Sequence, residues 1–397
     1  MKIAYFFEIF YPQINGVMTA TFNLARNMKK LGHEVLYIAP ETKGYSKPHT
    51  DDEIEVYRIP SIPTYLYDGI RMCLPKSKMI YNKLKREKVD VVHFTGPFTL
   101  ALNAIFHAKN LGIPVIQTFH TLLAEATYFQ YFFGTKSFPL GAKLVWRWMN
   151  IFNRHSDIIT APSDYVISSL KNNCHNKNII YISNGIDISE FKEYDSFEKL
   201  KNNYKEFNNK TYVFVGRLGQ EKSIDILIKA FAEVIKKDKE IKLFIIGHGP
   251  HELKLQKLAE KLGLINKNIF FTGKISNQKL IKNGLFHHAR AFITASKTEN
   301  QPMTILEATA CGTPLILPYE KGIKELISGN GLFFEPDNIK ELTEKILLLS
   351  ANDKLYKEYN TASLRLSKKY DGINVAKQFE KIYLENIKNL SKNNLIF

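Results

Sequence analysis

Short apolar runs alternate with helix-length segments along most of the chain, and this alternation restricts the available folds more than any other feature. In the first half, the runs that we predict to be strands lie at 2–7, 34–39, 89–94, 114–119 and 157–161. A polar, Lys/Asn-rich stretch interrupts the pattern, which then resumes with runs at 211–216, 241–247, 268–273, 291–294 and 314–318. Strands that alternate with helices favour a parallel sheet with right-handed crossovers and helices on both faces. We therefore predict an α/β protein with two doubly wound parallel-sheet domains, residues 1–195 and 196–371.

The composition supports folded domains and excludes several other classes of protein. Of the 397 residues, 45% are hydrophobic and 24% are charged, as in soluble globular proteins and unlike disordered, collagen-like or coiled-coil chains. The three cysteines, Cys73, Cys174 and Cys311, have no metal-ligand spacing, which favours a reduced, cytosolic compartment. The longest stretch without acidic or basic residues, 91–108, contains His, Asn, Gly and Pro, so it predicts no membrane span.

Three loops carry residues suited to binding a ligand at the carboxyl ends of such strands. In the first, Asn15-Gly16 is a turn signal at the predicted start of a helix, where anions bind. A tight strand-to-helix turn without any ligand explains the same residues equally well. In the second, Arg217 and Lys222 flank the entry to a helix and suit a pyrophosphate, although both could be ordinary surface cations. The glycines of this loop do not have Rossmann or Walker spacing.

The third loop, 298–314, contains two carboxylates, Glu299 before a predicted helix and Glu307 within it. A carboxylate can accept two hydrogen bonds from the vicinal hydroxyls of a ribose or hexose. The same pair could serve a hydrolase as acid and base, or each could be an ordinary surface glutamate. The spacing alone leaves these interpretations open.

Taken together, four motifs resemble glycosyltransferase family 4. They are Pro-x-x-Asn-Gly-Val at 12–17, Asn-Gly-Ile-Asp at 184–187, Gly-Arg-x4-Lys at 216–222, and Glu-x7-Glu followed by Ala-x-Ala-x-Gly-x-Pro at 299–314. The resemblance implies retaining, nucleotide-sugar-dependent enzymes of the GT-B fold, in which two facing Rossmann-like domains enclose an interdomain cleft. Within the family, the opening and the 298–301 stretch look most like bacterial 1,2-diacylglycerol 3-glycosyltransferases. It also implies that a C-terminal helix, about 372–397, packs back on the first domain.

The resemblance assigns roles residue by residue. His120 would contact the transferred sugar near the reacting carbon, and Glu299 would lie beside that sugar. Arg217 and Lys222 would hold the donor diphosphate, and these four residues form the predicted catalytic set. The predicted donor-binding set combines Arg217, Lys222 and Glu299 with Gly16, Gly247, Asn300, Gln301, Met303, Thr304 and Glu307, the last of these on the ribose hydroxyls. The donor would be UDP-glucose or UDP-galactose, with no cofactor or metal required. Pro302 and His248 depart from the residues usual in the family.

Two basic segments suggest how the chain would reach a lipid. The formal net charge of +16 is compatible with nucleic acid, an anionic membrane or a nucleoside diphosphate as partner. Between 71 and 88 there are seven cations and one acid, and Met79, Ile80 and Leu84 could share a helical face. Between 126 and 156 there is no acid, and both tryptophans of the chain lie there. Such segments bind anionic interfaces, although a core helix with surface cations has the same pattern.

The membrane-binding residues that we predict are Lys76, Lys78, Lys83, Lys85, Arg86, Trp146, Arg147 and Trp148. We expect a peripheral enzyme at the cytoplasmic face of the cell membrane, acting on diacylglycerol in an anionic bilayer, with no nucleic-acid partner because no nucleic-acid module accompanies the aromatics. Two alternatives stay open: a family 4 enzyme of surface polysaccharide or lipopolysaccharide synthesis with a lipid-linked acceptor, and a basic peripheral membrane protein without catalysis.

Overall fold

The computed structural model describes the chain except for residues 14, 43–53, 65–69, 123–137, 176–177 and 394–397, and the side chains of 138–140 and 391–393. The described residues form two compact units, Met1–Ile186 with Gly372–Phe397, and Asp187–Asp371. The boundary lies before the predicted residue 195 because the intervening residues belong to the second unit. There, Asp195 N donates to Lys282 O (2.7 Å), and the carbonyl of the buried residue Phe191 is 2.8 Å from His287 Nε2.

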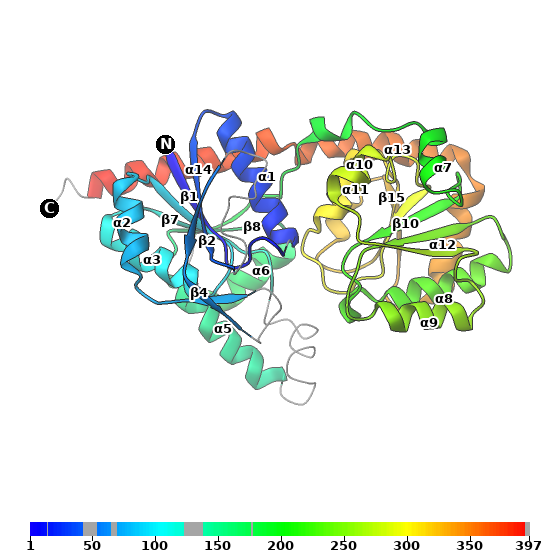
Figure 1. The fold of residues 1–397 in the computed structure, drawn as a ribbon, viewed down its shortest axis with the longest axis horizontal. Helices are drawn as coiled ribbons and strands as arrows, with labels where there is room; N and C mark the ends of the chain where they lie inside the picture. Colours follow the sequence, from blue (N-terminus) through cyan, green and yellow to red (C-terminus); the bar gives the residue numbers. More distant parts are fainter. Residues whose placement is uncertain (14, 43–53, 65–69, 123–137, 176–177, 394–397) are drawn as a thin grey trace. The chain divides into compact units, whose positions relative to one another are not determined.

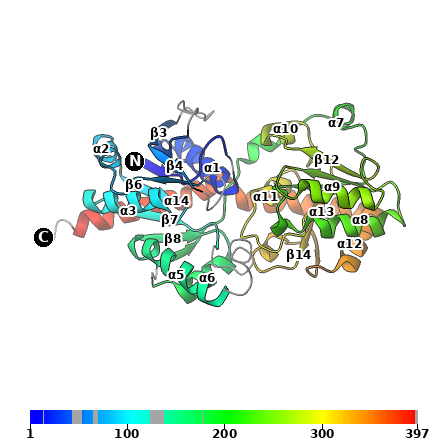
Figure 2. The same ribbon diagram turned by 60° about the horizontal axis from the view of Figure 1, so that its bottom comes forward.

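The first unit is built on a seven-stranded sheet in which all the strands are parallel. Its strand order is β3 (Glu55–Ile59), β2 (Glu34–Pro40), β1 (Lys2–Phe6), β6 (Val91–Phe94), β7 (Val115–Thr118), β8 (Ile158–Ala161) and β9 (Ile179–Tyr181). Helices cover both faces (Figures 1 and 2): α1 (Gly16–Lys30), α2 (Lys78–Arg86), α3 (Thr99–Leu111), α5 (Phe138–His155), α6 (Asp164–Asn173) and α14 (Gly372–Asn393). A small antiparallel pair, β4 (Ser61–Pro63) and β5 (Arg71–Cys73), accompanies the sheet.

The alternation along β1 explains why helices are needed on both faces. Ile3 and Tyr5 are buried in one core cluster with residues of α1 and α14, whereas Ala4 and Phe6 are buried in another with residues of α2 and α3. A parallel strand that is covered on both faces is apolar along its whole length, which is the signal that the sequence shows.

The second unit repeats this architecture with a six-stranded parallel sheet. Its order is β12 (Ile269–Gly273), β11 (Lys242–Ile246), β10 (Thr211–Val215), β13 (Ala291–Ile293), β14 (Leu315–Pro318) and β15 (Gly331–Phe334). The helices are α7 (Phe197–Asn203), α8 (Ile224–Ile235), α9 (Glu252–Lys261), α10 (Asn277–Lys282), α11 (Met303–Ala310), α12 (Ile339–Ala351) and α13 (Asp353–Ser367). The predicted α/β class with two doubly wound sheets is therefore confirmed.

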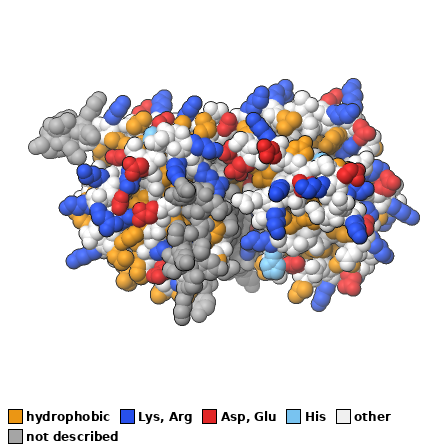
Figure 3. All heavy atoms as spheres, turned by 45° about the horizontal axis from the view of Figure 1, so that its top comes forward, with side chains coloured by type: hydrophobic (Ala, Val, Ile, Leu, Met, Phe, Trp, Pro, Cys, Tyr) orange, Lys and Arg blue, Asp and Glu red, His pale blue; other side chains and the backbone are white. Residues whose placement is uncertain are grey.

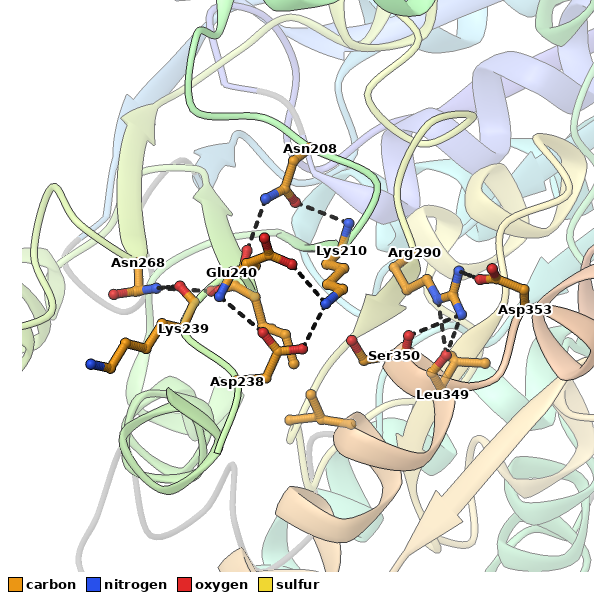
Figure 4. Close-up of polar contacts among 12 residues, drawn as sticks. Asn208, Lys210, Asp238, Lys239, Glu240, Asn268, Arg290, Leu349, Ser350 and Asp353 are labelled. Atoms are coloured by element: carbon orange, nitrogen blue, oxygen red, sulfur yellow. Dashed lines mark hydrogen bonds and ion pairs between the residues drawn. The ribbon is translucent and has the colours of Figure 1, made fainter. Parts of the chain in front are cut away.

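Ion pairs and hydrogen bonds close the amino-terminal edge of the second sheet (Figure 4). Lys210, just before β10, pairs with Asp238 (2.9 Å) and Glu240 (2.8 Å). The buried guanidinium of Arg290, just before β13, donates to the carbonyls of Leu349 and Ser350 at the end of α12. These contacts fix the helices to the sheet at the edge opposite to the carboxyl ends of the strands.

Candidate functional site

The order of strands locates a candidate site in each unit. The strand order reverses between β1 and β6 in the first unit and between β10 and β13 in the second. Open parallel sheets bind ligands beyond the carboxyl ends of the strands at such a reversal. The loops at these positions are the one after β1, which contains Gly16, the one after β10, which contains Arg217 and Lys222, and the one after β13, which contains Glu299.

The loop after β10 is held against the loop after β11 by backbone contacts. Gly216 N donates to Ile246 O and Leu218 N to His248 O, each at 3.0 Å. Gly247 has φ 147°, and a Cβ there would lie 1.8 Å from Gly216 O. Glycine is therefore required at 247 by the packing of the two loops, whereas its predicted contact with the donor stays a prediction.

Both predicted phosphate-binding cations are held by carboxylates. The Nζ of Lys222 forms an ion pair with Oε1 of Glu299, and both side chains are largely buried. Arg217 is more exposed, and its Nη2 donates to Oε1 of Glu221 at 3.1 Å. The pair of Lys222 and Glu299 joins the loops after β10 and β13, the two strands at the reversal. The structure therefore brings Lys222 and Glu299 into contact and places Arg217 on the same loop as Lys222, whereas their roles toward a donor stay predictions.

Glu307 is buried in α11, where Asn277 Nδ2 donates to its Oε1 at 3.2 Å. Burial raises the pKa of this carboxyl to about 7, with the Asn277 hydrogen bond lowering it and the charge of Glu190 raising it further. A carboxyl that is this far removed from water is costly to ionise unless a ligand supplies hydrogen bonds. Vicinal hydroxyls of a ribose would supply them.

The other predicted donor residues surround the start of α11. Gln301 and Met303 are buried, and Asn300 and Thr304 are half-buried. Pro302 occupies the position just before α11, where its missing N–H costs the helix nothing. A Cβ at Gly322 would lie 1.6 Å from Glu299 O, so the loop after β14 packs directly on the backbone of Glu299. Gly322, Glu221 and Asn277 were not predicted from the sequence. For Gly322, the available signal was the Lys321-Gly322 dipeptide after a predicted strand.

In the first unit, Asn15 caps α1 by accepting from Met18 N at 2.9 Å, which leaves Gly16 at the helix start. Among the described residues outside its own helix turn, no atom lies within 4 Å of a Cβ placed at Gly16. Glu8, also in this loop, is buried and accepts from Ala101 N (2.8 Å) and Leu100 N (3.3 Å) at the start of α3. Burial raises its pKa to about 8, although these backbone hydrogen bonds lower it. Glu8 is thus a helix cap that the sequence analysis did not single out.

His120 follows β7, the strand next to β6, and is half-buried. Burial lowers the pKa of its imidazole to about 4, so the ring is neutral at physiological pH. A neutral ring can both donate and accept a hydrogen bond, which suits contact with a sugar hydroxyl.

The first predicted membrane segment is corrected at Lys83. Its side chain is only 3% exposed, and its Nζ pairs with Glu55 (2.5 Å) and Glu87 (3.0 Å). Ile80 and Leu84 are fully buried in the core beneath α2, so the apolar face of this helix is not available to a membrane. Exposed cations remain at Lys76, Lys78, Lys85 and Arg86, with Met79 exposed beside them.

The second predicted segment, 126–156, is described from α5 onward, and its residues 126–137 lie outside the described residues. Trp148 is 41% exposed, and its Nε1 donates to Pro97 O at 2.9 Å. Trp146 stacks on Phe119 and is half-buried, so it belongs partly to the core. Arg147, Leu144 and Ile151 are exposed. Within the described parts of the chain, no helix is long and apolar enough to span a bilayer, and no three His, Cys, Asp or Glu residues are clustered as metal ligands.

Comparison with known proteins extends this description. A model of the Glycosyltransferase Family 4 domain matches residues 14–190, and a model of Glycosyl transferases group 1 matches residues 196–365. The alpha-monoglucosyldiacylglycerol synthase of Acholeplasma laidlawii is 29% identical over 99% of this chain and 98% of its own length. A GDP-mannose-dependent alpha-mannosyltransferase of Mycolicibacterium smegmatis is 26% identical over 86% of each chain.

Solved structures show the same fold. A glycosyltransferase from Rickettsia africae superposes with a TM-score of 0.77 at 20% identity, covering 98% of this chain and 99% of its own. The Anabaena protein HepE, solved in complex with UDP, gives the same TM-score at 16% identity, covering 97% of this chain and all of its own. The chain therefore has the fold of these two proteins.

Proposed function

Because the chain is a glycosyltransferase of family 4 with the GT-B fold, we propose that it transfers glucose or galactose from a UDP-sugar to the 3-hydroxyl of 1,2-diacylglycerol, with retention at the anomeric carbon. The observation that carries the donor half is the reversal of strand order in the second unit. There the cations Arg217 and Lys222 and the carboxylates Glu299 and Glu307 gather on adjacent loops and α11. Cations suit a diphosphate, and carboxylates suit sugar hydroxyls.

The proposed chemistry is transfer on one face of the sugar. The bond between the anomeric carbon and the β-phosphate oxygen breaks while the acceptor oxygen bonds to the same face of that carbon. The proton of the acceptor hydroxyl passes to the departing phosphate oxygen. Arg217 and Lys222 stabilise the negative charge that develops on this phosphate. Glu299 is engaged by Lys222, which supports a role in holding the sugar and the cation rather than one as a nucleophile.

Neutral His120 supports the same proposal. It would hydrogen-bond to a hydroxyl of the transferred sugar near the reacting carbon without adding a positive charge beside an oxocarbenium-like centre. Gly16, at the start of α1, would give the donor phosphates a backbone N–H and room for close approach.

The acceptor half rests on the relatives and on the surface of the first unit. Two proteins named alpha-monoglucosyldiacylglycerol synthase, from Acholeplasma laidlawii and Streptococcus pneumoniae, are each 29% identical to this chain. Two groups of exposed residues, which we together call the basic surface, are Lys76, Lys78, Lys85 and Arg86 at α2, and Arg147 and Trp148 on α5. The first group has exposed Leu74 (75%) and Met79 (42%) beside it in sequence, and the second has exposed Leu144 (60%). Each cation near an anionic bilayer contributes about 1 kcal/mol, and the apolar side chains add a contribution that salt does not screen.

The net charge does not single out this surface. On the face drawn in Figure 3, Lys and Arg side chains are spread over both units and interleaved with Asp and Glu. The distribution on that face supports reading much of the charge excess as solvated surface. What distinguishes the basic surface from the other cations is the exposed apolar side chains beside it.

The reaction is tested with purified protein, UDP-glucose or UDP-galactose, and vesicles with and without dioleoylglycerol. We expect UDP release that depends on dioleoylglycerol, and an α-linked monoglycosyl lipid by proton NMR. The Lys222→Ala variant serves as the inactive control. UDP release that a polyprenyl-phosphate-linked acceptor stimulates and dioleoylglycerol does not would favour the polysaccharide alternative. A folded protein that neither binds UDP nor releases it would favour the non-catalytic one.

Membrane attachment is tested by co-sedimentation with vesicles. Changing Lys78, Lys85 and Arg86 together to Gln should weaken binding to anionic vesicles and leave binding to neutral ones nearly unchanged. A matched control changes three exposed lysines of α9, Lys254, Lys257 and Lys261, to Gln. Binding that both triple variants reduce equally would show a nonspecific effect of net charge and contradict the proposed surface.

A further inference from the structure

A buried chain of hydrogen bonds crosses the first unit beneath the end of β7. We define this hydrogen-bond chain by Tyr5 on β1, Tyr383 on α14, His93 on β6, Thr118 on β7 and Thr160 on β8. The distances are 3.3 Å between the two tyrosine hydroxyls, 2.6 Å from Tyr383 to His93 Nδ1, 2.7 Å from His93 Nε2 to Thr118, and 2.7 Å from Thr118 to Thr160. All five side chains are at most 4% exposed.

The proton positions along this chain follow from its last member. Thr160 Oγ1 donates to the backbone carbonyl of Gln117 at 3.4 Å, and a carbonyl can only accept. Because a hydroxyl has one proton, the arrangement that satisfies every one of these contacts has Thr160 accept from Thr118 and Thr118 accept from His93. In this arrangement the proton of His93 resides on Nε2.

The other half of the chain follows from the charge of His93. Burial, with a smaller effect from His120, lowers the pKa of His93 to about 3, so the ring carries one proton. Its Nδ1 then accepts from Tyr383, and Tyr383 accepts from Tyr5. A single direction of donation runs through five different elements.

The end of this chain is also the place from which His120 projects. Thr118 is the last residue of β7, and His120 follows it by two positions. The residue between them is fixed as well, because Phe119 N donates to Thr160 O at 2.7 Å. Thr160 therefore forms hydrogen bonds with both Thr118 and Phe119 at this strand end, and Thr118 is also hydrogen-bonded to His93. The ring of His93 lies close enough to His120 for the two imidazoles to interact electrostatically.

We propose that His93 and Tyr383 are positioning residues, which fix the end of β7 and so hold the imidazole of His120 in place for sugar transfer. The inference rests on the role of His120 proposed above. It gives the C-terminal helix a part in the reaction, since α14 follows the whole second unit in sequence yet supplies the hydroxyl that hydrogen-bonds to His93 Nδ1.

The kinetic test compares two variants that each remove one hydroxyl from the hydrogen-bond chain with a third variant that keeps it. Tyr383→Phe removes the donor to His93, and Thr118→Val replaces the strand-end hydroxyl by an isosteric methyl. We expect each to lower kcat by about tenfold, the consequence of one buried polar atom left without a partner. Thr118→Ser keeps the hydroxyl and should restore most of the activity. The KM for the UDP-sugar and the Kd for UDP should stay within about twofold, because neither variant changes Gly16 or the contacts to the diphosphate and ribose that we propose for Arg217, Lys222 and Glu307.

Tyr212→Phe is the matched control for a purely structural loss. Tyr212 is fully buried in the second unit and donates to Ile346 O at 2.8 Å. Its loss should lower the melting temperature about as much as Tyr383→Phe does, without lowering kcat. To keep this test independent of the acceptor assignment, kcat is measured both for transfer to diacylglycerol and for the slower hydrolysis of the UDP-sugar.

Nitrogen-15 NMR of histidine-labelled protein reports the tautomers and protonation states in the hydrogen-bond chain without any substrate. His93 and His120 are assigned from His93→Gln and His120→Gln. We expect His93 to be the Nε2–H tautomer with no titration between pH 5 and 8, and Tyr383→Phe to shift the ring signals of His120. The proposal is overturned by an Nδ1–H tautomer at His93, by an unshifted His120 in Tyr383→Phe, or by wild-type kcat in both Tyr383→Phe and Thr118→Val. Equal losses in Thr118→Val and Thr118→Ser would also overturn it.

Discussion

The Glu307→Gln variant separates two effects of this buried carboxyl: its effect on the free energy of unfolding and its effect on UDP affinity. The pKa of Glu307 is raised from 4.5 to about 7, mainly by burial. At about 1.4 kcal/mol per pKa unit, ionising this group in the free protein costs about 3 kcal/mol of folding free energy. Glutamine has the same shape without the charge, and its side-chain oxygen can still accept from Asn277 Nδ2. The variant should therefore be more stable than the wild type wherever Glu307 is ionised.

The sign of the pH dependence follows from the direction of the pKa shift. Because the folded-state pKa lies above the unfolded value, the folded protein binds more protons between about pH 4.5 and 7, and its stability falls as pH rises through that window. The gain in stability from Glu307→Gln should be small at pH 5 and approach its full value, up to about 3 kcal/mol, at pH 8. In contrast to its stability, the UDP affinity of the variant should be lower than that of the wild type. If the ionised carboxylate accepts from both ribose hydroxyls, the variant should bind UDP about 10- to 100-fold more weakly at pH 8.

Urea unfolding at pH 5, 6.5 and 8, with isothermal titration of UDP at the same pH values, measures both quantities. Glu260→Gln, at an exposed position on α9, is the matched control and should change neither. A Glu307→Gln protein that is folded and binds UDP like the wild type at pH 8 would refute the ribose assignment. A variant that is less stable than the wild type at pH 8 would refute the argument that burial makes the ionised carboxyl costly.

Four further predictions concern single residues. Arg217→Ala should lower kcat/KM for the UDP-sugar by about 10²- to 10³-fold in steady-state assays, since it removes a charge-assisted phosphate contact; unchanged turnover would exclude that contact. Gly16→Ala should unfold like the wild type, because the described residues outside its own helix turn place no atom within 4 Å of the added methyl, yet raise the KM for the donor; an unchanged KM would contradict the close approach of donor and backbone. Gly247→Ala should lower the free energy of unfolding by about 1–3 kcal/mol in urea titrations, because its Cβ would clash with Gly216 O. Arg290→Met should cost about 1–3 kcal/mol by leaving buried carbonyls unpaired, with UDP affinity unchanged, because Arg290 lies at the opposite edge of the sheet; weakened UDP binding would contradict that separation.

Strands inside the two sheets were readable from the sequence, and several at the margins were not. The predicted runs coincide with the central strands because a strand that is covered on both faces must be apolar throughout. The sequence analysis did not predict β3, β9 and β15, and each lies at the margin of its sheet. A marginal strand is paired on one side only, so its composition is less constrained; Glu55-Val-Tyr-Arg-Ile59 illustrates the mixture.

The residues of the candidate donor site were named from motif spacing, but their contacts were decided by topology. Lys222 and Glu299 lie far apart in sequence, and they meet because β10 and β13 are neighbours at the reversal of strand order. Motif resemblance pointed to each residue separately. The burial that raises the pKa of Glu307 depends on side-chain packing that spacing does not encode.

Lys83, Tyr383 and His93 also show which properties the sequence determined and which depended on the tertiary structure. In the sequence, Lys83 is one cation of a basic run, but Glu55 and Glu87 surround it in the fold and remove it from any membrane surface. Tyr383 and His93 carry no sequence signal at all, because a buried hydrogen bond between them requires α14 to return across the first sheet. Hydrophobic periodicity and motif spacing are local properties of a chain, so they determine the elements and the fold class. Burial and polar pairing arise between residues that only the completed tertiary structure brings together.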